Sequence, residues 1–163
     1  MSVAPNPITR VPEGFRAREF GGGFMAVNGP LYARRTDAGL QLGFRVEERH
    51  CNPMRICHGG MMATFCDMLL PLATGALVPE LANRFLPTIG LQVDYLAPAT
   101  LGSWVEGTAE VLHVATSMVF VQGFVTADGR PVARTSGLFK ISRGRRDDRS
   151  IEAVARSPTV QPE

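Results

Sequence analysis

The chain has 163 residues, of which 45% are hydrophobic and 20% are charged, and its formal net charge is +2. This composition is ordinary for a globular protein, and the length predicts one domain. The net charge is small, and no cluster of Lys and Arg alternates with aromatic residues on a predicted strand or helix. We therefore expect no nucleic-acid partner.

The cysteines indicate the compartment. Cys51, Cys57 and Cys66 are odd in number and close together, which argues against a disulfide framework and predicts a reducing, cytoplasmic location. The first residues contain no basic segment followed by an apolar run, so no signal peptide is expected. The longest apolar stretch, residues 61–78, contains Asp67 and Pro71, so we expect no membrane span.

The N-terminal part, residues 1–38, is predicted to be an arm that ends in a short helix and a strand. Its first 13 residues contain three prolines, and the short helix is expected over residues 15–20. Two strands, 31–35 and 40–46, are predicted around a turn, because apolar and polar residues alternate in the second of them.

A single long helix is predicted from Gly59 to about Gly75, with a kink or an early end near Leu70 because Pro71 follows. It is followed by four strands, at residues 88–95, 103–115, 117–127 and 131–142. Asp128-Gly129 is typical of a tight hairpin turn. The order of elements predicts an α+β domain over residues 39–142, in which an antiparallel sheet surrounds one helix, followed by a polar tail at 143–163.

The predicted helix carries one carboxylate, Asp67, among apolar neighbours that predict burial nearly all round. A buried carboxylate is costly and is kept chiefly for function, although an acid on a solvent-facing side is the alternative. The helix opens with Gly59-Gly60, directly after His58, so its free N–H donors and the positive end of its dipole are open to a close approach. A donor pair and a carboxylate are two of the parts needed to attack an acyl carbonyl.

Several motifs around this helix resemble one family. His58-Gly59-Gly60 has Asp67 nine residues after the histidine and Asn52-Pro53 six residues before it. Downstream, residues 88–99 read Thr-Ile-Gly-Leu-Gln-Val-Asp-Tyr-Leu-Ala-Pro-Ala. Together these motifs resemble the hotdog-fold acyl-CoA thioesterases of the phenylacetate-pathway and 4-hydroxybenzoyl-CoA type, over residues 40–142. The resemblance implies a hotdog fold, an acyl-CoA substrate and hydrolysis of its thioester.

The resemblance also assigns roles to residues. Asp67 would be the general base or a nucleophile, and the Gly59 N–H would stabilise the oxyanion, an effect of ~3 kcal/mol for one such donor. His58 and Asn52 would line the thioester site, and Thr88 would help to position water. The alternatives are a capping histidine, a turn asparagine and an ordinary strand threonine. The remaining expected contacts to the substrate are Gly60, Met61, Thr116, Ser117 and Arg143, the last three near the phosphates of coenzyme A.

A second cluster competes for attention, because His50, Cys51, Cys57, His58 and Cys66 carry atoms that can bind a metal. Their spacing does not match the paired patterns of zinc sites, so we expect no metal and no redox cofactor. The alternative functions are a hotdog hydratase or dehydratase, and a protein that binds acyl-CoA without catalysis.

The spacing of Gly59 and Asp67 has a geometric consequence. Eight residues of helix separate them by ~12 Å along the axis, too far for both to serve one carbonyl. Across a two-fold axis, Asp67 of one chain could face Gly59 of another, so we predict a homodimer with two shared sites. The resemblance implies that two sheets join edge to edge, and we expect such dimers to assemble into a homotetramer.

Overall fold

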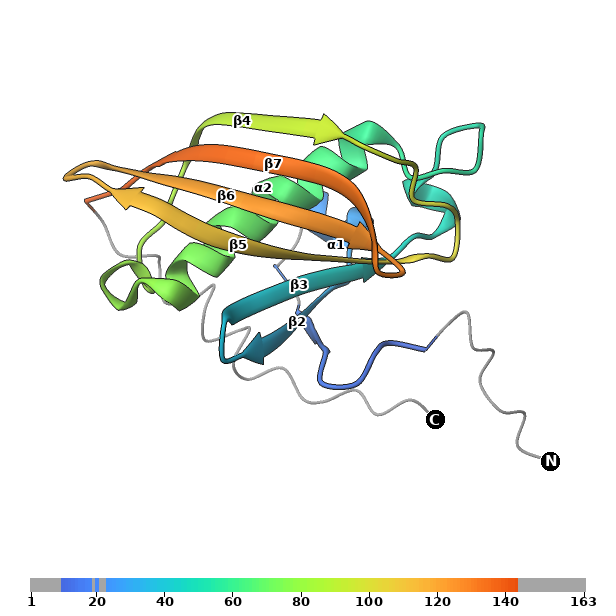
Figure 1. Ribbon diagram of the computed structural model, residues 1–163, viewed down its shortest axis with the longest axis horizontal. Helices are drawn as coiled ribbons and strands as arrows, with labels where there is room; N and C mark the ends of the chain where they lie inside the picture. Colours follow the sequence, from blue (N-terminus) through green and yellow to red (C-terminus); the bar gives the residue numbers. More distant parts are fainter. Residues whose placement is uncertain (1–9, 19, 21–22, 144–163) are drawn as a thin grey trace.

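The computed structural model describes residues 10–18, 20 and 23–143 (Figure 1). A seven-stranded sheet wraps around one long helix, α2 (Gly59–Leu77), and neighbouring strands are antiparallel throughout. The strand order is β1-β2-β3-β5-β6-β7-β4, so β1 and β4 form the two edges. The predicted α+β class is confirmed. The strands are β1 (Arg16–Arg18), β2 (Leu31–Thr36), β3 (Gly39–Arg45), β4 (Thr88–Tyr95), β5 (Trp104–Val114), β6 (Met118–Ala127) and β7 (Arg130–Lys140).

The predicted helix at residues 15–20 is wrong. Residues 16–18 form β1, which pairs with β2, and the short helix α1 lies later, at Phe24–Asn28. Phe15 explains the extended chain, because its ring packs edge-on against Trp104 with centroids 5.0 Å apart. This long-range contact outweighs the local preference. The rest of the predicted arm and tail, residues 1–9 and 144–163, lie outside the described residues.

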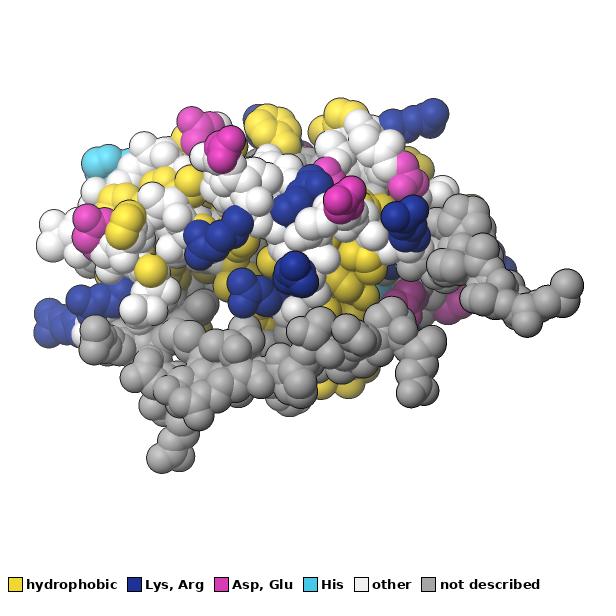
Figure 2. Space-filling model, turned by 90° about the horizontal axis from the view of Figure 1, so that it is seen from below, with side chains coloured by type: hydrophobic (Ala, Val, Ile, Leu, Met, Phe, Trp, Pro, Cys, Tyr) yellow, Lys and Arg dark blue, Asp and Glu magenta, His cyan; other side chains and the backbone are white. Residues whose placement is uncertain are grey.

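The other strand predictions are confirmed to within a residue or two. The β6–β7 hairpin turns at Asp128 and Gly129, whose φ values of 48° and 79° are those of a type I′ turn. Short 3₁₀ helices occur at Glu48–His50, called η2, and at Pro79–Leu81, called η3. Charged side chains of both signs are interspersed over the face in Figure 2, in keeping with the small net charge.

Helix α2 passes through Pro71 and ends at Leu77, so an early end near Leu70 did not occur. Pro71 has no N–H, and the helical bond that it cannot make is the one to the carbonyl of Asp67. Both residues lie on the half-exposed face of the helix, where an unpaired carbonyl can meet water. The length and apolar composition of α2 alone would suit a membrane span, a property that core helices packed against a sheet share.

Only one face of α2 is buried, which corrects the expectation of burial all round. The buried residues are Met61, Met62, Phe65, Cys66, Leu69, Leu70, Ala73 and Thr74. Glycines on the sheet allow this face to approach closely: a Cβ at Gly107 would lie 2.6 Å from the Leu69 side chain, and one at Gly137 would lie 2.8 Å from Leu70. The opposite face, which includes Ala63, Asp67 and Met68, is half-exposed in the single chain.

Candidate active site

The first turn of α2 is fixed by a histidine cap. His58 is the N-cap residue, and its Nδ1 accepts a hydrogen bond from the Gly60 N–H at 2.9 Å. A Cβ at Gly60 would lie 3.0 Å from that nitrogen, so the glycine leaves room for the histidine ring. Within the described part of the chain, no acceptor is paired with the Gly59 N–H. That donor remains available at the positive end of the helix.

Tyr95, at the end of β4, reaches the same turn. Its hydroxyl donates to the Gly59 carbonyl at 2.8 Å, and burial raises the pKa of this phenol, which keeps it a donor. Tyr95 is part of the motif at residues 88–99, which assigns it no role of its own. A tyrosine at the end of a strand can reach the start of a neighbouring helix, so its position was a usable signal. The spacing of residues did not identify the Gly59 carbonyl as the partner of its hydroxyl.

Asn52 fits both of its proposed roles. Its Oδ1 accepts from the backbone N–H groups of Met54 at 3.0 Å and Ile56 at 3.4 Å, which is the role of a turn residue. Its Nδ2 has no acceptor among the described residues, so these bonds orient the amide and leave its donor side available. We call Asn52, His58, Gly59, Gly60 and Tyr95 the start group.

Asp67 lies on the half-exposed face in the middle of α2. The Thr88 hydroxyl, from the first residue of β4, donates to its Oδ1 at 2.6 Å. A carboxylate buried without a partner was expected. Instead Asp67 is half-buried and hydrogen-bonded, so burial does not explain why it is present. We call Asp67 and Thr88 the carboxylate group.

The two groups occupy separate places on one chain. Gly59 is the first residue of α2 and Asp67 the ninth, which corresponds to ~12 Å of helix. Strand β4 contributes one residue to each group: Thr88, at its beginning, belongs to the carboxylate group, and Tyr95, at its end, belongs to the start group. Two hollows on the single chain lie elsewhere, one lined by residues of β4, β5, β6 and β7 and the other by residues of β2, β3, β5 and β6. Neither includes a residue of the two groups.

The predicted phosphate contacts form a third location. Thr116 and Ser117 are exposed in the turn between β5 and β6, and the Ser117 carbonyl accepts from the Ile141 N–H at 2.8 Å. Arg143 is exposed, and its carbonyl accepts from the Arg84 guanidinium at 2.8 Å.

This location lies at the Thr88 end of the sheet. Thr88 pairs with Phe139, and the next residue, Lys140, donates its N–H to the Pro87 carbonyl at 2.9 Å. Arg84 and Lys140 were not predicted as site residues, because isolated basic residues carry no sequence signal until the fold brings them together.

His50, Cys57 and Cys66, which were considered as metal ligands, are occupied by other contacts or are wholly or partly buried in the fold. The ring of His50 accepts from the Glu47 N–H and contacts the Asn28 carbonyl at 3.1 Å, and burial lowers its pKa. Burial also raises the pKa of the Cys57 and Cys66 thiols to about 12. Across residues 10–18, 20 and 23–143, no three ligand-type side chains come together as a metal site. Met61, expected to contact substrate, is buried in the core.

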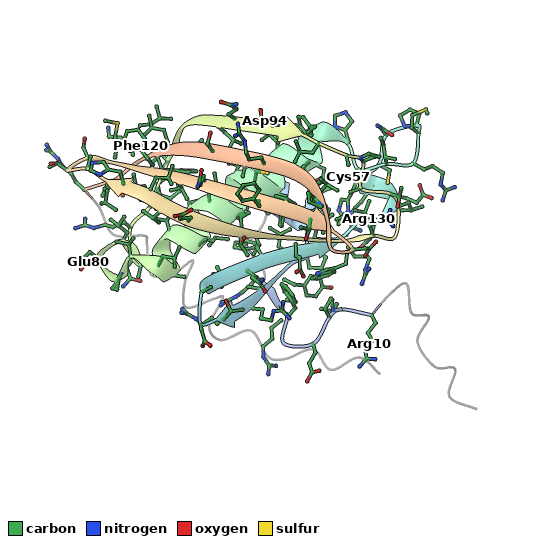
Figure 3. All side chains as sticks on the ribbon, in the orientation of Figure 1. Arg10, Cys57, Glu80, Asp94, Phe120 and Arg130 are labelled. Carbon is green, nitrogen blue, oxygen red and sulfur yellow. The ribbon has the colours of Figure 1, made fainter. Side chains whose placement is uncertain are left out.

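Two residues labelled in Figure 3 help to find these locations on the molecule. Cys57, labelled there, lies at the end of the molecule where α2 begins, and Asp94 lies on β4. Asp94 forms an ion pair with Arg134 of β7 at 2.7 Å. A hydrogen bond from Gln92, together with the contact to Arg134, lowers the pKa of the Asp94 carboxyl. Asp94 is thus a half-exposed aspartate on the same strand as Thr88, and it belongs to neither group.

Comparison with known proteins identifies the family of the chain. The family model described as Thioesterase superfamily matches residues 54–133. The Pseudomonas aeruginosa protein named "Putative esterase PA0474" is 32% identical over 136 residues, which cover 82% of this chain and 99% of that protein. Human acyl-coenzyme A thioesterase 13 is 32% identical over 92 residues, which cover 55% of this chain and 64% of that protein.

Solved structures share the fold. A hypothetical thioesterase from Streptococcus pneumoniae, crystallised with coenzyme A, has a TM-score of 0.60 at 20% identity, and the match covers 72% of this chain and 88% of that one. Zebrafish thioesterase superfamily member 2 has a TM-score of 0.62 at 21% identity, with coverages of 75% and 88%. The chain therefore belongs to the thioesterase superfamily and has the hotdog fold. It is a thioester hydrolase.

Proposed function

We propose that the protein hydrolyses an acyl- or aryl-CoA thioester to the free acid and coenzyme A, at sites that two chains share. The observation that carries the proposal is the separation of the two groups on α2. One end presents an available backbone donor at Gly59, and the middle presents a carboxylate that Thr88 holds in place. Each is half of a site for acyl transfer.

In the proposed reaction the Gly59 N–H and the Asn52 amide donate to the carbonyl oxygen of the thioester. Asp67 acts in one of two ways. As a base it takes a proton from water, whose oxygen bonds to the carbonyl carbon; as a nucleophile it forms a mixed anhydride that water then opens. In both cases the carbon–sulfur bond breaks and the sulfur leaves as the thiolate of coenzyme A, which takes up a proton. Neither route requires a metal or a redox cofactor.

The surfaces available on the single chain support a two-fold dimer. Strand β4 is an edge of the sheet, and Ile89 and Tyr95 on it are 53% and 56% exposed. The face of α2 that carries Asp67 is also half-exposed, next to this edge. Pairing two β4 edges would set the two helices side by side, so that Asp67 of one chain faces Gly59 of the partner subunit.

A second apolar surface supports the proposed tetramer. On the outer side of the sheet, Leu112, Phe120 and Phe124 are 52%, 39% and 55% exposed. Phe120, labelled in Figure 3, lies on β6, which β7 separates from the β4 edge. Exposed apolar patches commonly mark interfaces. We propose that two dimers pack through this surface.

Coenzyme A phosphates would lie at the third location, beside Arg84, Lys140 and Arg143. These cations lie at the same end of the sheet as Thr88 of the carboxylate group. Several structural neighbours were crystallised with coenzyme A or acetyl-CoA, among them proteins of Streptococcus pneumoniae, Bacillus halodurans and Streptococcus mutans. Three free cysteines support a reducing, cytoplasmic location.

Hybrid dimers test the shared site. Gly59→Pro removes the proposed oxyanion donor at the first helical position, where proline is tolerated, and the extended backbone of His58 suits a following proline. Gly59→Ala is the matched control, because it keeps the N–H and places its Cβ in ordinary contact with Tyr95 at 3.4 Å. We expect Gly59→Pro and Asp67→Asn to be inactive alone, and Gly59→Ala to stay active.

When equal amounts of the two inactive variants are unfolded together and refolded, about half of the dimers should be hybrids, from the 1:2:1 pairing of two equal pools. Each hybrid has one intact site, so about a quarter of the wild-type activity should return. Activity is followed by release of free thiol from a panel of acyl-CoA thioesters. Hybrids that form, as seen by mass spectrometry, yet stay inactive would show that each chain builds its own site.

A further inference from the structure

Tyr95 and His58 are connected through a single peptide group. The Tyr95 hydroxyl donates to the carbonyl of Gly59, and the N–H of that same peptide, which belongs to Gly60, donates to Nδ1 of His58. The two distances are 2.8 and 2.9 Å. Hydrogen bonds joined through a peptide in this way polarise one another, so a bond at the carbonyl makes the N–H a better donor.

The second of these bonds determines how the His58 ring carries its proton. Nδ1 accepts from an N–H, so it has no hydrogen of its own, and a neutral ring must then carry its proton on Nε2. His58 is exposed, and its Nε2 has no partner in the described ranges of the chain. The ring therefore presents an N–H donor to the surroundings, beside the available N–H of Gly59.

The packing around this turn leaves little freedom. A Cβ at Gly60 would meet His58 Nδ1 at 3.0 Å and Cε1 at 3.3 Å, so a side chain at residue 60 would push the ring away. On the other side, the Tyr95 ring lies 3.4 Å from the position of a Cβ at Gly59. Tyr95 is fixed on β4 by its pairing with Ala133 of β7. Strand β4 thus fixes Tyr95, Tyr95 is hydrogen-bonded to the first turn of α2, and that turn is hydrogen-bonded to the His58 ring.

We propose that Tyr95 is a positioning residue: through the Gly59–Gly60 peptide, it keeps His58 as an Nε2–H donor directed at the bound thioester. The proposal rests on the proposed hydrolysis of thioesters at this site. Tyr95 does not touch the substrate in it. Its hydroxyl donates to the carbonyl of the Gly59–Gly60 peptide, and the N–H of the same peptide, polarised by that bond, donates to His58.

Tyr95→Phe tests the proposal, because it keeps the ring and removes only the hydroxyl. The first readout is the ¹⁵N NMR spectrum of the histidine rings in the otherwise intact protein, with the His58 signals assigned from a His58→Gln variant. In the wild type we expect the Nε2–H form of His58. In Tyr95→Phe we expect both ring nitrogens to shift toward a mixture of the two neutral forms, and kcat to fall about 2- to 12-fold with KM unchanged, the range that one ordinary hydrogen bond supports.

Two further variants complete the test. Tyr32→Phe is the matched control, since Tyr32 is the other tyrosine of the chain and packs on Trp104, away from this turn. It should leave the His58 signals and kcat unchanged. Gly60→Ala displaces the His58 ring without altering Tyr95, so it should reproduce the spectral change of Tyr95→Phe and lower kcat at least as much.

The outcomes are distinct. His58 signals and kcat that stay the same in Tyr95→Phe would overturn the proposal, and so would a loss of stability with unchanged His58 signals, which is what a purely structural tyrosine would give. The spectra do not depend on turnover. A shift of the His58 signals in a protein that hydrolyses no thioester would therefore leave the connection intact and refute the proposed function instead.

Discussion

The start group and the carboxylate group lie on the same helix but are built in different ways. The start group consists largely of backbone, held by the hydrogen bonds of His58, Tyr95 and the Asn52 side chain. The carboxylate group consists of two side chains joined by one hydrogen bond, between Thr88 and Asp67. The comparison shows that the start group depends on local backbone geometry, whereas the carboxylate group depends on the chemistry of one residue, Asp67.

Removing that chemistry should have the largest effect. Asp67→Asn keeps the size of the side chain and can still accept from Thr88, so we expect it to fold normally. Turnover should fall by about two to four orders of magnitude, the usual range for loss of a general base or nucleophile. Steady-state hydrolysis and binding of a non-hydrolysable acyl-CoA analogue would be measured together, and binding should persist.

Asp94→Asn is the matched control for this change. Asp94 is also an aspartate next to the proposed site, but it pairs with Arg134 on the outer surface, and its replacement should leave turnover close to that of the wild type. Normal hydrolysis by a folded Asp67→Asn protein would remove Asp67 from the mechanism.

On the donor side, Asn52→Asp separates the two functions of the asparagine. The aspartate keeps an oxygen for the N–H groups of Met54 and Ile56 but loses the Nδ2 donor. We expect kcat to fall about 100-fold, at the low end for removal of an oxyanion donor, while thermal stability changes little. An active Asn52→Asp enzyme would restrict Asn52 to its turn.

A smaller effect is expected at Thr88. Thr88→Val has nearly the same shape and removes the hydroxyl, whereas Thr88→Ser retains it. Since one hydrogen bond to a charged group is lost, kcat should fall about 10-fold in the valine variant and stay near wild type in the serine variant. Equal rates in the two variants would mean that the bond at 2.6 Å does not orient Asp67 for catalysis.

The last prediction concerns stability, not rate, and it involves His50, whose backbone contacts the start group. The His50 carbonyl accepts from the His58 N–H at 2.8 Å, and burial lowers the pKa of the His50 ring. A group with a lowered pKa in the folded state binds protons more readily when unfolded. Its stabilising effect is therefore complete above the unfolded value of about 6.5 and is lost as pH falls toward the folded pKa.

Urea unfolding between pH 8 and pH 5 measures this effect. The free energy of unfolding should decline toward acid pH in the wild type, and the decline should be shallower in His50→Gln. The control is His113→Gln, an exposed position on β5, which should keep the wild-type slope. An unchanged slope in His50→Gln would mean that His50 does not link pH to stability.

Much of the fold could be predicted from the sequence, and the exceptions have physical reasons. The alternation in β3, the Asp128-Gly129 turn and the apolar run of α2 each specify local structure directly. The helix predicted at residues 15–20 failed because Phe15 is held by Trp104, 89 residues away in sequence. Local preference contains no information about such a partner.

The same contrast applies to the candidate site. Asp67, Gly59, His58, Asn52 and Thr88 could be named from motifs. The hydrogen bond between Thr88 and Asp67 could not, because the motifs assigned Thr88 to the positioning of water. Tyr95 and Arg84 could not be assigned, because their partners are backbone carbonyls, those of Gly59 and Arg143, and any residue type supplies a carbonyl. The expected burial of Asp67 failed because a helix apolar on every side was taken to be covered by one chain.

The free edge of β4 also affects how the protein must be handled while it folds. An edge strand presents unpaired N–H and C=O groups that can pair with any extended chain. Here the edge is flanked by exposed Ile89 and Leu96, and β4 itself contains neither lysine nor proline to discourage wrong partners. Refolding at high concentration therefore favours pairing of extended chains with this edge. Refolding yield should rise on dilution, and aggregates should grow from the strand that otherwise holds both halves of the site.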